Sequence, residues 1–116
     1  KIISVGYYNR WIKNNHLGLN PTNFIDVLKN SSYVFTSMFH GAMFSVKFSK
    51  QFYFSLDPIR KNKIESFINN LNLNDRIILD EINENYIDYK ELNKTLNLLI
   101  LKSQKFLGDN IRQFYK

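Results

Sequence analysis

The residues best suited to chemistry lie around His40, where a strand-like segment gives way to a helical one. His40 is a titratable hydrogen-bond donor, Gly41 lets the backbone approach a bound group without a Cβ in the way, and Thr36 and Ser37 add hydroxyls. In open parallel sheets, such junctions present unpaired N–H groups and the positive end of a helix dipole to anions. Two interpretations stay open: a ligand contact or a structural histidine.

The elements that must position this junction alternate along the chain. Residues 33–36 form a compact apolar strand, and residues 41–48 have the apolar spacing of a buried helix. Residues 51–56 are an aromatic strand that ends at Asp-Pro, and residues 60–71 again have helical spacing. A further strand or extended segment is expected at residues 76–79.

The two ends of the chain complete this pattern. Residues 2–8 are a β-rich run, and the polar stretch from Asn9 to Asn20 is interpreted as a long βα loop. Asn20 caps a short helix that begins at Pro21, and Asp88 caps a closing helix that covers residues 87–116. Strands that alternate with helices predict an α/β fold with a mainly parallel sheet and helices on both faces.

Composition bounds the function classes. The chain has 116 residues, 44% of them hydrophobic, which favours one globular domain over a disordered segment. It contains no cysteine, so disulfides and thiolate metal sites are excluded, and His16 stands alone in a polar stretch, so no metal is expected. No apolar run approaches the ~20 residues that span a bilayer, which predicts a soluble protein. Because Lys1 opens directly into a strand, we expect the sequence to be a fragment.

The net charge of +6 is placed unevenly. Residues 1–58 carry six Lys/Arg and two Asp/Glu, whereas residues 59–116 carry ten and eight. A basic surface raises the local concentration of anionic ligands, although a Lys-rich surface also serves solubility alone. A nucleic-acid-binding module is disfavoured because the aromatic residues follow buried-strand and helix-core spacing and do not share one exposed face.

Residues 33–45 read Tyr-Val-Phe-Thr-Ser-Met-Phe-His-Gly-Ala-Met-Phe-Ser. They closely resemble the signature of the polysaccharide pyruvyl transferase family, in which a strand ending in Thr leads through Phe-His-Gly to an apolar helix. Lys-Gln-Phe at residues 50–52 and Leu-Asn-Leu-Asn-Asp-Arg at residues 71–76 extend the resemblance, which covers nearly the whole chain. In the family's pattern Lys63 is often Arg, Asn72 is usually Gly, and Met38 is often Ser or Arg.

The resemblance implies a Rossmann-like domain, the C-terminal half of a GT-B-like enzyme whose other half is missing here. It implies transfer of pyruvate from phosphoenolpyruvate, as a ketal, to a sugar of a cell-envelope or exopolysaccharide precursor. Beyond this donor substrate no cofactor is implied, and the expected place is the cytoplasm or the inner face of the membrane. The isolated fragment is expected to be inactive.

The resemblance also assigns roles at the His40 junction. His40 contacts the donor's phosphate or protonates its methylene carbon, and the amides of Gly41 and Ala42 help to hold the anion. Arg60 and Lys63, after the next strand, hold a second anionic group or are simply exposed cations at a helix start. Lys63 in place of Arg lacks the planar guanidinium group, which binds a carboxylate or phosphate through two parallel hydrogen bonds. The expected substrate-binding residues are Thr36, Ser37, Phe39, Gly41, Ala42, Arg60 and Lys63.

Partners and alternatives follow from the same features. Tyr7, Asn9, Arg10 and Trp11 follow the first strand and contact a sugar, or Trp11 anchors the loop. The closing helix covers its own sheet, crosses to the missing N-terminal domain or forms a homodimer through Phe106, Ile111, Phe114 and Tyr115. The second enzymatic interpretation is the C-terminal domain of a nucleotide-sugar-dependent glycosyltransferase.

Overall fold

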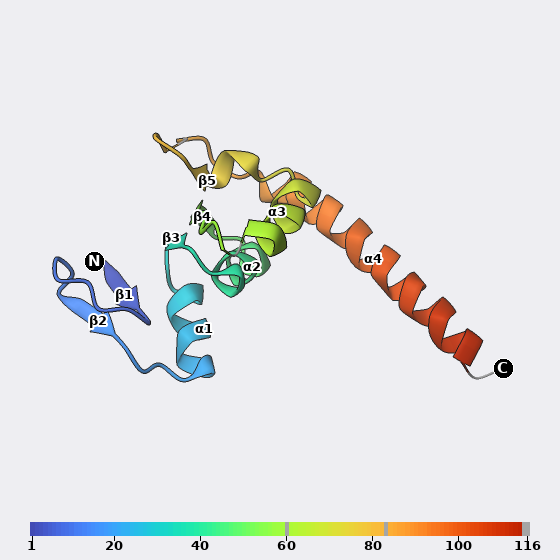
Figure 1. Cartoon of the computed structure of the whole chain (residues 1–116), viewed down its shortest axis with the longest axis horizontal. Coiled ribbons are helices and arrows are strands. Elements are labelled where there is room, and N and C mark those ends of the chain that lie inside the picture. Colours follow the sequence, from blue (N-terminus) through green and yellow to red (C-terminus); the bar gives the residue numbers. More distant parts are fainter. Residues whose placement is uncertain (60, 83, 115–116) are drawn as a thin grey trace. The chain divides into compact units, whose positions relative to one another are not determined.

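The computed structural model describes residues 1–59, 61–82 and 84–114. The chain divides into two compact units, Lys1–Ser55 and Leu56–Lys116. Short parallel strands alternate with helices in the first unit, and helices predominate in the second (Figure 1). The protein is therefore α/β, as the sequence predicts.

The first unit opens with two parallel strands, β1 (Ile3–Val5) and β2 (Asn14–His16). Ile3 lies opposite Asn14, and the Gly6 amide donates to the His16 carbonyl at 2.9 Å just beyond the paired residues. The interpretation of residues 9–20 as one long loop is therefore wrong. The Asn-Asn-His sequence of β2 has no apolar alternation, and the strand forms because its backbone pairs with β1.

Helix α1 (Pro21–Lys29) begins as predicted. The Asn20 side chain accepts a hydrogen bond from the Asn23 amide at 2.8 Å, and Pro21 occupies the first helical position, where it needs no amide partner. Phe24 meets Phe44 of the next helix edge to face, with ring centroids 6.3 Å apart. This aromatic contact packs α1 against α2.

Strand β3 (Tyr33–Thr36), helix α2 (Phe39–Lys47) and strand β4 (Gln51–Ser55) form the centre of the first unit. The strands run parallel, with Thr36 opposite Phe54, and α2 packs against both of them. Apolar side chains from all three elements are buried, which makes this crossover the core that positions the His40 junction. The buried residues are Val34, Ala42, Val46, Phe52, Tyr53 and Phe54.

In the second unit, helix α3 (Lys61–Asn70) leads into a 3₁₀ turn (Asn74–Arg76) and the short strand β5 (Ile77–Ile78). After α3, Asn72 adopts a φ of 54°, in the left-handed region that favours glycine. The predicted extended segment at residues 76–79 is thus shorter than expected, because Arg76 still belongs to the turn. Arg76 is fully buried and donates through Nη2 to Asp75 Oδ2 at 3.0 Å and to the Asn85 carbonyl.

Helix α4 (Tyr89–Phe114) confirms the predicted long closing helix and its cap. The Asp88 carboxylate accepts from the Lys90 amide at 3.0 Å, and Leu92 on the first turn is buried. Figure 1 shows α4 as one unbroken helix, and its C-terminal half, from Ile100 onward, is almost wholly exposed. Tyr115, expected on the same face, lies outside the described residues. Within the described ranges, no helix is both long and apolar enough to cross a membrane.

Candidate functional site

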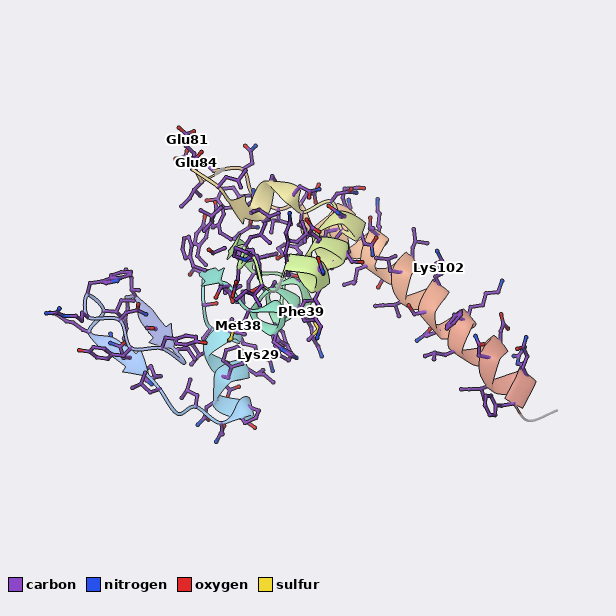
Figure 2. The ribbon with its side chains drawn as sticks, viewed as in Figure 1. Lys29, Met38, Phe39, Glu81, Glu84 and Lys102 are labelled. Atoms are coloured by element: carbon purple, nitrogen blue, oxygen red, sulfur yellow. The ribbon has the colours of Figure 1, made fainter. Side chains whose placement is uncertain are left out.

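The His40 junction is a helix start whose exposed face carries the imidazole. Met38 is the extended residue before the helix, and α2 begins at Phe39, two residues earlier than the sequence predicts (Figure 2). His40 and Gly41 therefore lie within the first helical turn and not in a preceding loop. His40 is exposed, and its ring meets the Phe39 ring edge to face at a centroid distance of 5.9 Å.

Gly41 is required by a close approach of the chain to itself. A Cβ on Gly41 would lie 2.3 Å from Thr36 Oγ1 and 2.9 Å from Thr36 Cβ, well inside van der Waals contact. The Thr36 side chain occupies this space, so the absence of a Cβ serves packing within the chain, and the predicted contact of Gly41 with a ligand stays a prediction. Close packing between the end of β3 and the first turn of α2 fixes where His40 emerges.

The Thr36 hydroxyl has a structural role of its own. Its oxygen accepts a hydrogen bond from the Met38 amide at 3.1 Å, which holds the two residues between β3 and α2 in a tight turn. The hydroxyl also donates to the Met38 carbonyl at 3.4 Å, so both of these hydrogen bonds shape the turn, and its predicted role as a donor to a ligand stays a prediction. Ser37 lies inside that turn and is exposed, so its hydroxyl faces solvent.

The backbone amides of the first turn divide into used and available groups. The Ala42 amide donates to the Met38 carbonyl at 3.2 Å, and the Ala42 side chain is fully buried. The Ala42 amide, predicted to help hold an anion, is thus engaged in the first hydrogen bond of the helix. The amides of His40 and Gly41 precede this first intrahelical bond, so they belong to the group that a helix leaves without intrahelical partners. They are the backbone donors that suit an anion here.

The electrostatics of the first unit favour an anion. Its 55 residues carry six Lys/Arg, and Asp26 is their one acidic residue. Lys29, from the last turn of α1, places its Nζ 5.2 Å from the centroid of the Phe48 ring, just after α2 (Figure 2). This cation is thereby held against an aromatic face of the unit.

Two of the predicted substrate-binding residues, Arg60 and Lys63, belong to the second unit. Lys63 is exposed in the first turn of α3, and Lys61 pairs with Glu65 across one turn at 3.3 Å. Arg60 lies outside the described residues. Among the described residues, no group of three or more His, Cys, Asp or Glu side chains is placed to hold a metal ion.

An asparagine network between β1 and β2 was not anticipated from the sequence. Asn15 Oδ1 accepts from the Asn9 amide at 2.8 Å, and Asn15 Nδ2 donates to the carbonyls of Asn9 at 3.2 Å and Ile12 at 2.6 Å. Asn9 Nδ2 in turn donates to Ser4 Oγ at 2.5 Å. The available signal was the recurrence of asparagine at positions 9, 14 and 15, a residue that often bonds neighbouring backbone.

The same segment decides the question of Trp11. Its side chain is 75% exposed, so it does not anchor the loop. Tyr7 and Tyr8 are also largely exposed, and the asparagine network holds the backbone in their place. The aromatic residues after β1 are therefore available for contact with a ligand.

No protein-family model, no curated protein and no solved structure matches the chain. Its function has to be inferred from its own residues and their geometry.

Proposed function

We propose that this chain is the C-terminal half of a polysaccharide pyruvyl transferase, a Rossmann-like domain of a GT-B-like enzyme. The observation that carries the proposal is the exposed His40 in the first turn of α2, at the carboxyl end of parallel strand β3. This is where parallel sheets bind anionic substrates. On this proposal the enzyme works in the cytoplasm or at the inner face of the membrane.

The reaction needs a held anion and an acid. Two sugar hydroxyls form C–O bonds to C2 of the enolpyruvyl group, and the bond from C2 to the phosphate oxygen breaks. One hydroxyl proton is balanced by the proton that converts the methylene to a methyl group, and the other leaves with inorganic phosphate. As C2 becomes electron-poor, a donor that protonates the methylene carbon lowers the barrier.

His40 is the group assigned to this step. As imidazolium it either delivers the proton or contacts the departing phosphate, and its exposure leaves it open to a substrate in both cases. The amides of His40 and Gly41 hold one anionic group of phosphoenolpyruvate at the helix start. The role of Lys63 and Arg60 toward a second anionic group stays a prediction from the resemblance, since both residues belong to the second unit.

A backbone feature outside the site supports the proposed family. Asn72 replaces the glycine that the family's turn usually carries, and its φ of 54° is a conformation that glycine adopts without strain. Asparagine is one of the few other residues that tolerate it. The backbone at this position therefore has a conformation that glycine would readily adopt.

Replacement of His40 by Gln in the complete two-domain enzyme tests the proposal. Glutamine keeps a hydrogen-bond donor but cannot act as an acid, so we expect ketal formation to fall about a hundredfold or more. His16→Gln is the matched control, because His16 is the chain's other histidine, is exposed and lies on β2. Unchanged ketal formation in the His40→Gln enzyme would rule out this role.

Calorimetry separates the two enzymatic interpretations. Phosphoenolpyruvate and nucleotide sugars are offered separately to the two-domain protein. Binding of phosphoenolpyruvate that weakens in the His40→Gln variant supports the pyruvyl transferase. Binding of a nucleotide sugar without phosphoenolpyruvate would identify a glycosyltransferase, whose second domain also places phosphates at a helix start.

A further inference from the structure

The segment that joins β1 to β2, residues 6–13, is rigidly held although it is at the surface. The Asn15 side chain makes three hydrogen bonds to the backbone of Asn9 and Ile12, and Ser4 Oγ donates to the Tyr7 carbonyl at 2.7 Å. Gly6, with a φ of 85°, allows the chain to turn immediately after β1. The side chains on this segment are therefore presented by a backbone fixed before any ligand arrives, which lowers the entropic cost of binding.

Beside this segment lies a hollow of about 280 Å³. Trp11 forms one wall and exposes 75% of its surface, although an indole of this size would be stabilised by burial. The volume is close to the lower limit of small-molecule pockets, roughly 300 Å³, so it suits one sugar-sized group. The lining residues are Lys1, Ile2, Trp11, Ile12, Lys13 and Asn14.

The lining combines the three kinds of contact that a charged sugar uses. The C–H face of a pyranose ring lies well on the electron-rich face of an indole, and the Asn14 amide suits ring hydroxyls. The Lys13 ammonium supplies a cation, and no acidic residue precedes Asp26 in the sequence. The hollow therefore combines a largely apolar lining with two lysines, and no acidic residue among residues 1–25 offsets their charge.

We infer that the hollow beside Trp11 binds a pyranose ring that carries a phosphate or a carboxylate. This inference rests on the proposed function, for which it names the chemistry of the acceptor: a sugar phosphate or an acidic sugar of the glycan precursor. Trp11 stacks on the ring, Asn14 bonds a hydroxyl and Lys13 holds the anionic group. The asparagine network keeps this arrangement in place.

A single-stranded nucleic acid would also use aromatic and basic side chains. Such binding needs a groove in which successive bases stack and a cationic track along several phosphates. The hollow has one aromatic residue and the volume of one small group, so a sugar is favoured. An oligonucleotide is therefore one arm of the test.

Trp11 itself provides the readout, because it is the chain's one tryptophan. The protein is titrated with N-acetylglucosamine 1-phosphate, methyl glucuronide, methyl glucoside, inorganic phosphate and an oligothymidine. We expect a saturable blue shift of the emission with one or both charged sugars, and the responding sugar distinguishes phosphate from carboxylate. No response to either charged sugar, an equal response to methyl glucoside, or a response to the oligothymidine alone would overturn the inference.

Two variants assign the contacts, with binding measured by calorimetry. Lys13→Gln should weaken binding of the charged sugar about tenfold, the effect of one hydrogen bond to a charged group. Lys47→Gln, an exposed lysine on α2 outside the lining, is the matched control and should leave it unchanged. Trp11→Ala should abolish binding, and retained affinity would contradict the stacking role.

A parallel titration with phosphoenolpyruvate separates the two proposals. If the two-domain protein binds phosphoenolpyruvate in a His40-dependent manner but no charged sugar, the proposed function stands and the hollow is not the acceptor site. If charged sugars bind at Trp11 and phosphoenolpyruvate does not bind, the sugar site stands and the pyruvyl transferase assignment fails.

Discussion

At the scale of single residues, the contact between Gly41 and Thr36 is the feature on which the candidate site most depends. Thr36 cannot easily move away from an added Cβ, because its hydroxyl accepts from the Met38 amide at 3.1 Å. We expect Gly41→Ala to lower the free energy of unfolding by about 1–3 kcal/mol, as overpacking in a well-packed region does. Urea denaturation followed by far-UV circular dichroism measures the change.

Gly108→Ala is the matched control for this substitution. Gly108 lies inside α4 and has nothing within 4 Å of the place where a Cβ would sit, so alanine should raise the free energy of unfolding by about 0.5–1 kcal/mol. The double variant Thr36→Ala, Gly41→Ala removes the closest contact and should be less destabilised than the sum of its single changes. Equal stability of Gly41→Ala and the wild type would show that the turn relaxes freely.

The partly buried phenol of Tyr89 links the stability of the protein to pH in the alkaline range. Burial raises the pKa of its phenol well above the ordinary value of 10.0, and the Arg76 guanidinium lowers that pKa by a smaller amount. The unfolded chain therefore loses this proton first, so the contribution to stability is complete below pH 10 and is lost as the pH rises beyond it. We expect the urea midpoint to fall as the pH rises above about 10, and to fall less in Tyr89→Phe.

Tyr86→Phe serves as the control, because Tyr86 lies in the same unit and is 73% exposed. Lysine deprotonation affects all three proteins alike over this pH range, so it cancels in the comparison. A Tyr89→Phe variant with the same alkaline loss as the wild type would contradict the assignment to Tyr89.

At the scale of elements, the sequence predicts best where a local rule sets the boundary. Asn20 with Pro21 and Asp88 are caps that act on amides two or three residues away, and both helices begin where those residues predict. The strands predicted at residues 33–36 and 51–56 are confirmed, the second one residue shorter, because each contains an apolar run. Val34 in the first strand and Phe52, Tyr53 and Phe54 in the second are buried.

Prediction from the sequence fails where backbone pairing between strands or a close contact between residues sets the boundary of an element. Strand β2 has no apolar side chain, and α2 begins before Gly41 because Thr36 shapes the preceding turn. The position of His40 at the strand-to-helix junction could be read from the sequence, but the roles of its neighbours could not. Whether Thr36, Gly41 and Ala42 face a ligand or one another depends on contacts between individual atoms, and the sequence does not specify these contacts.

At the scale of the whole molecule, the two units differ in their charge and in their exposed apolar surface. The first unit carries six Lys/Arg and one acidic residue, whereas the second carries the long helix α4. The C-terminal half of α4 exposes a stripe of apolar side chains that repeats at helical spacing. This stripe consists of Ile100, Leu107, Ile111 and Phe114, and the exposed Phe106 lies beside it.

A stripe of this kind, with Phe114 93% and Leu107 58% exposed, favours association with a second apolar surface. We expect the 116-residue chain to self-associate through it as a two-fold dimer, with a sedimentation coefficient that rises with protein concentration. The double substitution Leu107→Gln, Phe114→Gln should give a monomer, because it removes two of the largest apolar contacts without changing the charge.

Leu98→Gln is the matched control for α4. Leu98 is 67% exposed but lies nine residues from Leu107, which places it on the opposite side of a helix with 3.6 residues per turn. If the stripe is the interface, Leu98→Gln should dimerise like the wild type. If association instead depends on any exposed apolar side chain, Leu98→Gln and the Leu107→Gln, Phe114→Gln variant should both weaken it. A wild-type chain that stays monomeric at every concentration would rule out the dimer and leave the stripe to the proposed N-terminal domain.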